Sequence, residues 1–416
     1  IPPEEAVAIK GFGGGMGCGS TCGALTGAVA ACGHLYQMAA PKNALNHFTG
    51  ALVNAFKAKA GSILCDDIKP RLIDPDVRCF KTVEIGCDVL LEQAKAMGLT
   101  GATVQIAPED IKRVKGLGFL HNKGTNCFSC RVITGNGRIT TEKMACINAA
   151  AKKHGDGHVC LTTRLTVEIP GIPFDHIEAI RADLAKAGLE TGGTGSKVRP
   201  VVSCKGTTCQ YGLYDTFGLS ERIHETFYKG WHDVTLPHKF KIAVGGCPNN
   251  CVKPDLNDLG VIGQRVSSVK PTVCKGCKQC AVEKGCPIGA AQVVDGLLTI
   301  DSSKCNNCGR CVALCPFDAI EGDTYGYKVV IGGRWGKKVA QGRALNHFFT
   351  SESEIMTVIE KAILLFREQG KSGERFSDTI ARIGFDQIEK ELLSDAILSR
   401  KDAILKGMTV TGGASC

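Results

Sequence analysis

The sequence has few aromatic residues and no long hydrophobic run. Aromatic side chains make up 6% of the 416 residues, and no stretch of about 18 apolar residues predicts a membrane-spanning helix. The net charge of +9 is modest, and the chain has neither an RNA-binding signature nor a dense basic tract, which disfavours nucleic acid as a partner. The Gly-rich residues 11–17 follow no predicted strand, and no nicotinamide or flavin fingerprint appears. We therefore expect a cytoplasmic protein that binds neither nucleic acid nor membrane.

Cysteine, by contrast, is abundant. The chain has 23 cysteines, many of them at two-residue spacing. A disulfide framework is typical of small secreted domains, whereas clustered thiols in a chain of this length indicate bound metal under reducing conditions. The cysteines therefore predict metal centres rather than disulfides.

The pattern of apolar and β-branched residues changes several times along the chain. Apolar residues recur at three- and four-residue intervals in the first hundred residues, which predicts a small helical module. β-branched segments with turn signals then alternate with helical segments, which predicts an α+β arrangement. The predicted domains are residues 1–98, 99–197, 198–268 together with 323–416, and a cysteine-dense insertion at 269–322.

Two cysteine runs lie in this insertion. Each has three cysteines at two-residue spacing and a fourth that precedes a proline. Three such thiolates can bind part of a [4Fe-4S] cluster, and in two-cluster ferredoxins the fourth cysteine of each run binds the other cluster. A zinc-binding knuckle is the alternative. The predicted ligand sets are Cys274, Cys277, Cys280 and Cys315 for one cluster and Cys305, Cys308, Cys311 and Cys286 for the other.

Two further pairs occur in CKGTTC (204–209) and GGCPNNC (245–251). Neither pair has the C-x2-C spacing typical of a zinc ribbon. Four thiolates on two loops can hold one more [4Fe-4S] cluster, and the glycines before Cys247 allow the backbone to approach it closely. The third predicted ligand set is Cys204, Cys209, Cys247 and Cys251.

The order of these two pairs, with GGCPNNC and the nearby LNDLG, resembles the sirohaem-dependent sulfite and nitrite reductases. The resemblance covers residues 103–390 and is strongest to the small anaerobic sulfite reductases that carry an inserted ferredoxin segment. It implies a sulfite/nitrite reductase-like α+β unit with an inserted ferredoxin-like domain. It also implies that Cys251 bridges the third cluster to the iron of sirohaem.

The resemblance also assigns roles to several basic residues. Like charges 4 Å apart repel by about 4 kcal/mol at an effective dielectric constant near 20, so a cation cluster indicates a bound anion. Lys239 and Lys241, two apart on a predicted strand, point to one face and could supply protons. The residues that match the substrate side of sirohaem in the family are Arg131, Arg164, Arg199, Lys239 and Lys241. The residues proposed to pair with sirohaem carboxylates, or else to be plain surface charge, are Arg334, Lys337 and Lys338.

The first hundred residues resemble a redox-active module defined by a CGAxxG motif and scattered downstream cysteines. The motif is CGALTG at Cys22, and two interpretations are open: a fourth [4Fe-4S] cluster or a thiol redox site. The candidate residues are Cys18, Cys22, Cys65, Cys79 and Cys87.

Taken together, these patterns predict an anaerobic enzyme that reduces sulfite to sulfide with six electrons. The electrons would pass from an external donor, such as a ferredoxin or a reductase subunit, through the ferredoxin-type clusters to sirohaem. Nitrite reduction to ammonia and a non-catalytic electron-transfer subunit are the alternatives. Because the chain holds one copy of the basic unit, we expect a homodimer or higher oligomer.

Overall fold

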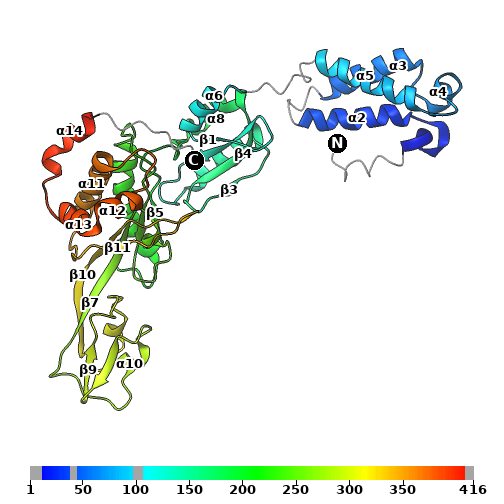
Figure 1. Ribbon diagram of the computed structural model, residues 1–416. Coiled ribbons are helices and arrows are strands. Elements are labelled where there is room, and N and C mark those ends of the chain that lie inside the picture. Colours follow the sequence, from blue (N-terminus) through cyan, green and yellow to red (C-terminus); the bar gives the residue numbers. More distant parts are fainter. Residues whose placement is uncertain (1–11, 38–44, 97–105, 408–416) are drawn as a thin grey trace. The chain divides into compact units, whose positions relative to one another are not determined.

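The computed structural model describes residues 12–37, 45–96 and 106–407, and the chain divides into two compact units, residues 1–107 and 108–416 (Figure 1). The first unit is a helical module, as the apolar spacing predicts. Phe48, Leu52 and Phe56 recur every four residues on one helix and are fully buried against Leu25 and Val89. The helices are α2 (Gly23–Gln37), α3 (Leu45–Ala60), α4 (Cys65–Leu72) and α5 (Phe80–Ala96), preceded by the π-type turn η2 (Gly15–Gly19).

The second unit begins with a four-stranded antiparallel sheet in the order β1-β2-β4-β3. Alternate residues of β2 are fully buried, namely Phe128, Cys130 and Val132, which is the pattern of a strand with one face in the core. Thr140 caps α7 by accepting a hydrogen bond from the backbone N–H of Lys143. The elements are α6 (Pro108–Gly116), β1 (Phe119–His121), β2 (Cys127–Val132), α7 (Thr141–His154), β3 (Cys160–Leu161), β4 (Val167–Pro173), η4 (Phe174–His176) and α8 (Ile177–Lys186).

A five-stranded mixed sheet in the order β11-β10-β7-β6-β5 forms the centre of this unit. The pairs β5·β6 and β6·β7 are parallel, whereas β7·β10 and β10·β11 are antiparallel. Every residue of β6 is buried, as expected for a central strand covered on both faces. The strands are β5 (Val202–Ser203), β6 (Ile242–Gly245), β7 (Leu259–Val269), β10 (Ile320–Ile331) and β11 (Arg343–Ala344).

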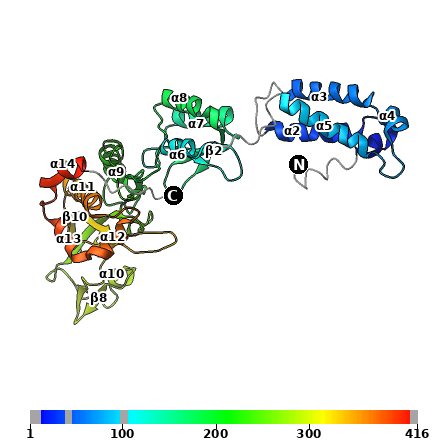
Figure 2. The same ribbon diagram turned by 45° about the horizontal axis from the view of Figure 1, so that its top comes forward.

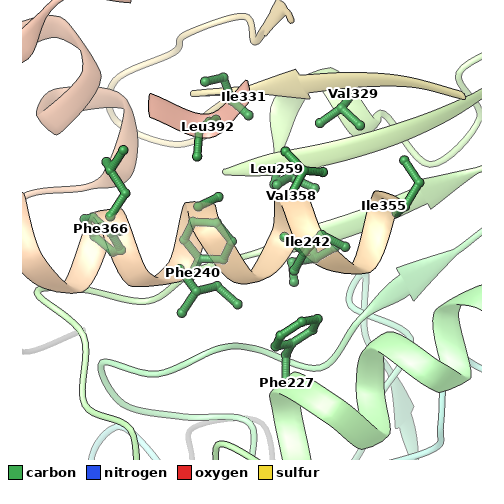
Figure 3. Close-up of a cluster of buried hydrophobic side chains, with 14 of the residues drawn as sticks. Phe227, Phe240, Ile242, Leu259, Val329, Ile331, Ile355, Val358, Phe366 and Leu392 are labelled. Carbon is green, nitrogen blue, oxygen red and sulfur yellow. The ribbon is translucent and has the colours of Figure 1, made fainter. Parts of the chain in front are cut away.

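Helices pack on this sheet and close the main hydrophobic core. Figure 3 shows side chains of β6, β7 and β10 meeting those of α11. The ring centroid of Phe240 lies 5.9 Å from that of Phe366 and 5.3 Å from that of Phe376. The helical tail expected from residue 352 onward supplies much of this core. The helical elements are η5 (Gly206–Thr208), α9 (Thr216–Ile223), η6 (His224–Lys229), η7 (Pro254–Leu256), α11 (Glu352–Gln369), α12 (Phe376–Ile383), α13 (Phe385–Leu393), η9 (Leu398–Arg400) and α14 (Lys401–Lys406).

Strands β7 and β10 extend beyond the sheet as a two-stranded ribbon that carries the cysteine-dense insertion (Figures 1 and 2). The ribbon pairs from Leu259 with Ile331 to Val269 with Ile320, with one irregularity near Glu321. The insertion has its own small core, in which Val282 and Leu298 are buried beside the cysteines. Its elements are α10 (Ala281–Gly285), β8 (Ala291–Val294), β9 (Leu297–Ile300) and η8 (Arg310–Ala313).

Two local expectations differ from the structure. The first of the β-branched segments expected after the helical module, residues 104–108, lies partly outside the described residues, and its Pro108 begins α6, where its fixed φ suits the first turn of a helix. Lys239 and Lys241 precede β6 rather than lying on it, although Phe240 between them forms an isolated bridge with Val198. The two lysines still flank a fully buried residue in an extended segment, so they keep the alternation that was expected of a strand.

Candidate iron-sulfur and anion-binding site

Two cavities in the insertion are each lined by four cysteines. Each cavity takes three cysteines from one run and the last cysteine of the other run, which is the crossed arrangement that the sequence predicts. One small cavity is lined by Cys274, Cys277, Cys280 and Cys315. The other small cavity is lined by Cys286, Cys305, Cys308 and Cys311.

The backbone around these cavities favours thiolates at two positions. Hydrogen bonds from the backbone N–H groups of Gly276 and Leu298 lower the pKa of Cys274. Burial opposes ionisation of Cys286, but backbone N–H groups of residues 288–291 outweigh it and lower its pKa. Such N–H donors also surround the sulfurs of iron-sulfur clusters, whose potentials they tune.

A zinc ion and a [4Fe-4S] cluster need different arrangements of four thiolates. Within the parts of the chain that the structure describes, no group of three or more His, Cys, Asp or Glu residues is arranged to hold a single metal ion. A zinc ion held at about 2.3 Å by every thiolate draws its ligands close together, whereas each thiolate of a [4Fe-4S] cluster binds a different iron. Each four-cysteine cavity offers one thiolate for each iron of a cubane cluster.

The third cysteine set lies where β5 and β6 end. The N–H of Gly246 donates to Cys204 Sγ at 3.1 Å, and Cys251 is exposed on the loop that follows β6. Burial raises the pKa of Cys247, and the neighbouring thiols of Cys204, Cys251 and Cys209 raise it further, so the four sulfurs lie within electrostatic reach of one another. The arrangement can hold one cluster whose Cys251 corner faces open space.

Glycines allow these two cysteine loops to approach each other. A Cβ atom on Gly246 would lie 2.9 Å from the Cα of Gly206, and one on Gly206 would lie 2.5 Å from Thr216 Cγ2. The Thr216 hydroxyl donates to the carbonyl of Cys204 at 2.9 Å and so fixes the first loop. Glycine is required at both positions because any side chain would separate the two pairs of cysteines.

The five basic residues proposed for the substrate side gather at one place. Arg164 is half-buried and donates to the carbonyl of Pro200 at 3.1 Å and to Asn257 Oδ1 at 2.7 Å, both neutral acceptors. Burial lowers the pKa of Arg164 to about 10; Asp258 opposes this shift, while Arg199, Arg375 and Arg131 add to it. Arg131 and Arg199 both donate to the carbonyl of Gly193, and Arg131 also forms an ion pair with Glu168. The surroundings of Arg164 therefore disfavour its charge, and a bound anion would offset this effect as Asp258 does in part.

Lys241 belongs to the same cluster. Burial lowers its pKa to about 8; Arg164, Arg375 and Lys239 lower it further, and Asp258 opposes them. His238 directly precedes Lys239. Burial, together with Lys239 and the surrounding arginines, lowers the pKa of His238 to about 4, so its imidazole is neutral near pH 7. Lys241 is thus a lysine that can both bind an anion and release a proton near neutral pH.

A buried ion pair that the sequence analysis missed supports the cluster. Asp258 is fully buried and accepts hydrogen bonds from Arg375 Nη2 at 2.8 and 3.0 Å and from the N–H of Lys241 at 2.9 Å. Burial raises the pKa of Asp258 even though Arg375 lies beside it. LNDLG marked the position of Asp258 without indicating a role, and no motif marked Arg375.

The residues proposed to bind sirohaem carboxylates have different surroundings. Arg334 forms an ion pair with Asp378 at 2.9 Å, so a cofactor carboxylate would have to share or replace this partner. Lys337 and Lys338 are exposed in a turn closed by backbone hydrogen bonds between Arg334 and Ala340. The structure thus separates Arg334 from the other two.

A wider cavity lies apart from the cations. It is formed by residues 133–143 and 188–190 together with α9 and η6. None of the five basic residues lines it, and its charged residues balance in sign: Arg138, Lys143 and Lys229 against Glu190, Glu221 and Glu225. It lacks the excess positive charge that an oxyanion site needs.

In the helical unit, three of the five candidate cysteines lie close together. An antiparallel bridge between Thr21 and Leu64 places Cys22 and Cys65 as diagonal neighbours on one face, and both are buried. Burial raises the pKa of Cys65, Lys69 lowers it, and Cys22 and Cys79 raise it. Cys18, which donates to the Gly15 carbonyl, and Cys87 on α5 are exposed.

Comparison with known families agrees with this geometry. Residues 194–397 match the nitrite and sulphite reductase 4Fe-4S domain, and residues 120–187 match the nitrite/sulfite reductase ferredoxin-like half domain. Residues 1–98 match a family described as a putative redox-active protein, whose pattern contains GCAxxG where this chain has CGALTG. The chain belongs to the nitrite and sulphite reductase family and carries this redox-active module at its N-terminal side. It is an α+β oxidoreductase of that family.

Individual relatives point the same way. An uncharacterised protein of Methanocaldococcus jannaschii is 29% identical over 64% of this chain and 91% of its own length. The coenzyme F420-dependent sulfite reductase of that organism is 32% identical over 56% of this chain, and one subunit of the anaerobic sulfite reductase of Salmonella typhimurium is 33% identical over 31%. The match spans only 37% and 41% of these two proteins.

A solved structure shows the same fold. The crystal structure of dissimilatory sulfite reductase I covers 84% of this chain and 86% of its own, with a TM-score of 0.54 and 21% identity. Among the described residues, no helix combines the length and the apolar character needed to cross a bilayer.

Proposed function

We propose that the chain binds sirohaem and three [4Fe-4S] clusters and reduces sulfite to sulfide. The observation that carries this proposal is the gathering of five basic residues in the same unit as a four-cysteine site whose Cys251 is exposed. An electron carrier has no need of buried cations that bind an anion. The sulfite reductases among the relatives support this choice of substrate.

The chain's own residues divide the work. Cys204, Cys209 and Cys247 would hold three irons of the third cluster, and Cys251 would join that cluster to the sirohaem iron. When bound, sirohaem supplies an iron for the substrate and passes it single electrons. The two four-cysteine cavities of the insertion would hold the clusters that deliver those electrons.

The cation cluster would bind the oxyanion and supply protons. Cleaving S–O bonds consumes protons, and Lys241, with a pKa of about 8, is mostly protonated at pH 7 yet acidic enough to donate. Arg164, with a pKa of about 10, keeps its charge at this pH, and Arg164 and Arg199 would stabilise negative charge on the substrate oxygens as it develops. An anion in turn relieves the repulsion among the cations.

Nitrite reduction to ammonia is the second candidate. The nitrite reductase [NAD(P)H] large subunit of Klebsiella oxytoca is 36% identical over 30% of this chain, and nitrite is a small oxyanion that also takes six electrons. Steady-state rates with a reduced dye as donor should be measured on both substrates. A preference for nitrite of about a thousandfold, about 4 kcal/mol in transition-state stabilisation, would reverse our assignment.

The other partners follow from the same proposal. We propose that an external ferredoxin or reductase subunit supplies electrons in the cytoplasm, and that two or more copies of the chain assemble. In the helical unit, the grouping of Cys22, Cys65 and Cys79 suits either a fourth cluster or a thiol redox site. Light scattering that shows a fully active monomer would contradict the proposed oligomer.

A Cys251→Ala variant tests the proposal directly. It should lose dye-linked sulfite reduction while the insertion keeps its two clusters, because their cysteines lie elsewhere. A variant that retains sulfite reduction would contradict the proposed role of Cys251.

A further inference from the structure

The insertion contacts the loop that follows Cys209 through an arginine that lies on a tyrosine ring. The guanidinium carbon of Arg310 is 4.4 Å from the ring centroid of Tyr211. Arg310 lines the Cys286/Cys305/Cys308/Cys311 cavity, and Tyr211 follows Cys209 by two residues. The contact thus joins a loop of one four-cysteine site to a loop of another.

The loop that carries Tyr211 is fixed to the third cysteine set. The N–H of Gly212 donates to the carbonyl of Cys209 at 2.9 Å, and the N–H of Leu213 donates to the carbonyl of Gly246 at 3.0 Å. Gly212 lies so close to the carbonyl of Gly206 that a Cβ atom could not be accommodated there. Tyr211 therefore has a defined position relative to this set.

Strand β7 connects the same two sites from the other side. Ile262 pairs with Gly245 at the end of β6, and three residues farther along, Arg265 bridges to Cys308 and donates its N–H to Asn307 at 2.8 Å. Three residues of a strand span about 10 Å. The Ser267 hydroxyl hydrogen-bonds to Cys311, so the same strand also contacts a second cysteine of this cavity.

The other four-cysteine cavity lies at the far end of the ribbon. Val269, where β7 ends, packs with Cys274 and Cys280, and the N–H of Cys274 donates to the carbonyl of Lys270 at 3.1 Å. From Ile262 to Val269 the strand covers about 23 Å. The two cavities of the insertion are therefore at unequal distances from the third cysteine set.

We propose that the two sites of the insertion act in order and that Arg310 and Tyr211 form a positioning pair, which holds the inner site against the third cysteine set. The inner electron-transfer site is Cys286/Cys305/Cys308/Cys311. The outer site is Cys274/Cys277/Cys280/Cys315. This rests on the proposed function. Each transfer moves one electron from the inner site to the third cysteine set, and no covalent bond forms or breaks. Electron transfer slows steeply with distance, so a contact that limits loop movement should speed this transfer.

The test uses the complete holoprotein and four substitutions at the contact. Arg310→Met removes the cation and Tyr211→Leu removes the ring, whereas Tyr211→Phe and Arg310→Lys preserve the interaction in part. Arg343→Met is the matched control, because Arg343 lies 3.8 Å from the ring centroid of Phe385 and belongs to β11, outside the ribbon and its insertion.

The first measurement is amide hydrogen exchange over residues 305–313. Arg310→Met and Tyr211→Leu should each speed exchange by about two- to fivefold, the range expected for an exposed cation–π contact. The double variant should add little to either single variant, because both remove the same interaction. Tyr211→Phe and Arg310→Lys should lie between the parent protein and these variants, and Arg343→Met should match the parent protein. Additive effects, or no effect of either single variant, would overturn the pairing.

The second measurement is rapid mixing with a reduced dye, in which electron arrival at the third cysteine set is followed by freeze-quench paramagnetic resonance. Arg310→Met and Tyr211→Leu should slow arrival by the same factor while leaving all midpoint potentials unchanged. If unaltered arrival accompanies faster exchange, the contact is structural only and the proposal is wrong. A parent protein without sirohaem would refute the proposed function instead, and the exchange measurement would still judge the contact.

Discussion

Lys241 offers a quantitative test of the cation cluster. Its pKa is lowered to about 8 by burial and by the neighbouring arginines, so about one lysine in ten is neutral at pH 7 and about nine in ten at pH 9. The positive form is therefore lost as the pH rises through 8. If an oxyanion binds only beside the charged lysine, its Kd should rise about tenfold from pH 7 to pH 9. Nitrite suits the titration because it keeps one negative charge over this range.

Three variants separate Lys241 from its neighbours. Lys241→Met should weaken nitrite binding at pH 7 and abolish the tenfold pH dependence, because the titrating group is gone. Lys241→Arg should keep tight binding with a flat profile, since guanidinium stays charged. Lys239→Met should weaken binding but keep the profile. Binding is followed in the visible spectrum of the oxidised protein, and a Lys241→Met protein that still loses tenfold affinity near pH 8 would refute the reasoning.

Two further predictions concern stability and cluster assembly, and a third concerns the helical unit. Asp258→Asn should lower the free energy of unfolding by about 3 kcal/mol in urea titrations because it leaves Arg375 buried without its counter-charge; a loss below about 1 kcal/mol would contradict this. Cys277→Ala and Cys308→Ala should each remove about four irons per chain, whereas a loss of about eight from either would show that the two sites assemble as one. Cys65→Ala should abolish any cluster or redox-active dithiol of the helical unit, measured by iron content and thiol titration on the full chain, and an unchanged result would exclude Cys65.

The cysteine sites are the part of the molecule that local sequence carries most clearly. Two-residue spacing places three thiols of each ferredoxin-type set on one loop, and the ligand pattern of two-cluster ferredoxins then predicts the crossed sets. The helices and the buried strand β6 likewise follow from local periodicity.

Contacts between distant segments could not be found in this way. Asp258 and Arg375 are 117 residues apart, and neither lies in a pattern that indicates a partner. Tyr211 and Arg310 come together only because the β7 and β10 ribbon returns the insertion to the loop after Cys209. Charge alone also did not show that Arg334 would have Asp378 as a protein partner. Burial and tertiary pairing decide these cases.

Quantitation of iron, acid-labile sulfide and extracted tetrapyrrole on one anaerobic preparation tests the central claim most directly. The proposed three clusters and one sirohaem predict about 13 irons and about 12 sulfides per chain, with a strong Soret band and a red absorption band. A fourth cluster in the helical unit would add about four of each. Iron and sulfide without any tetrapyrrole would contradict the proposed enzyme and leave an electron carrier.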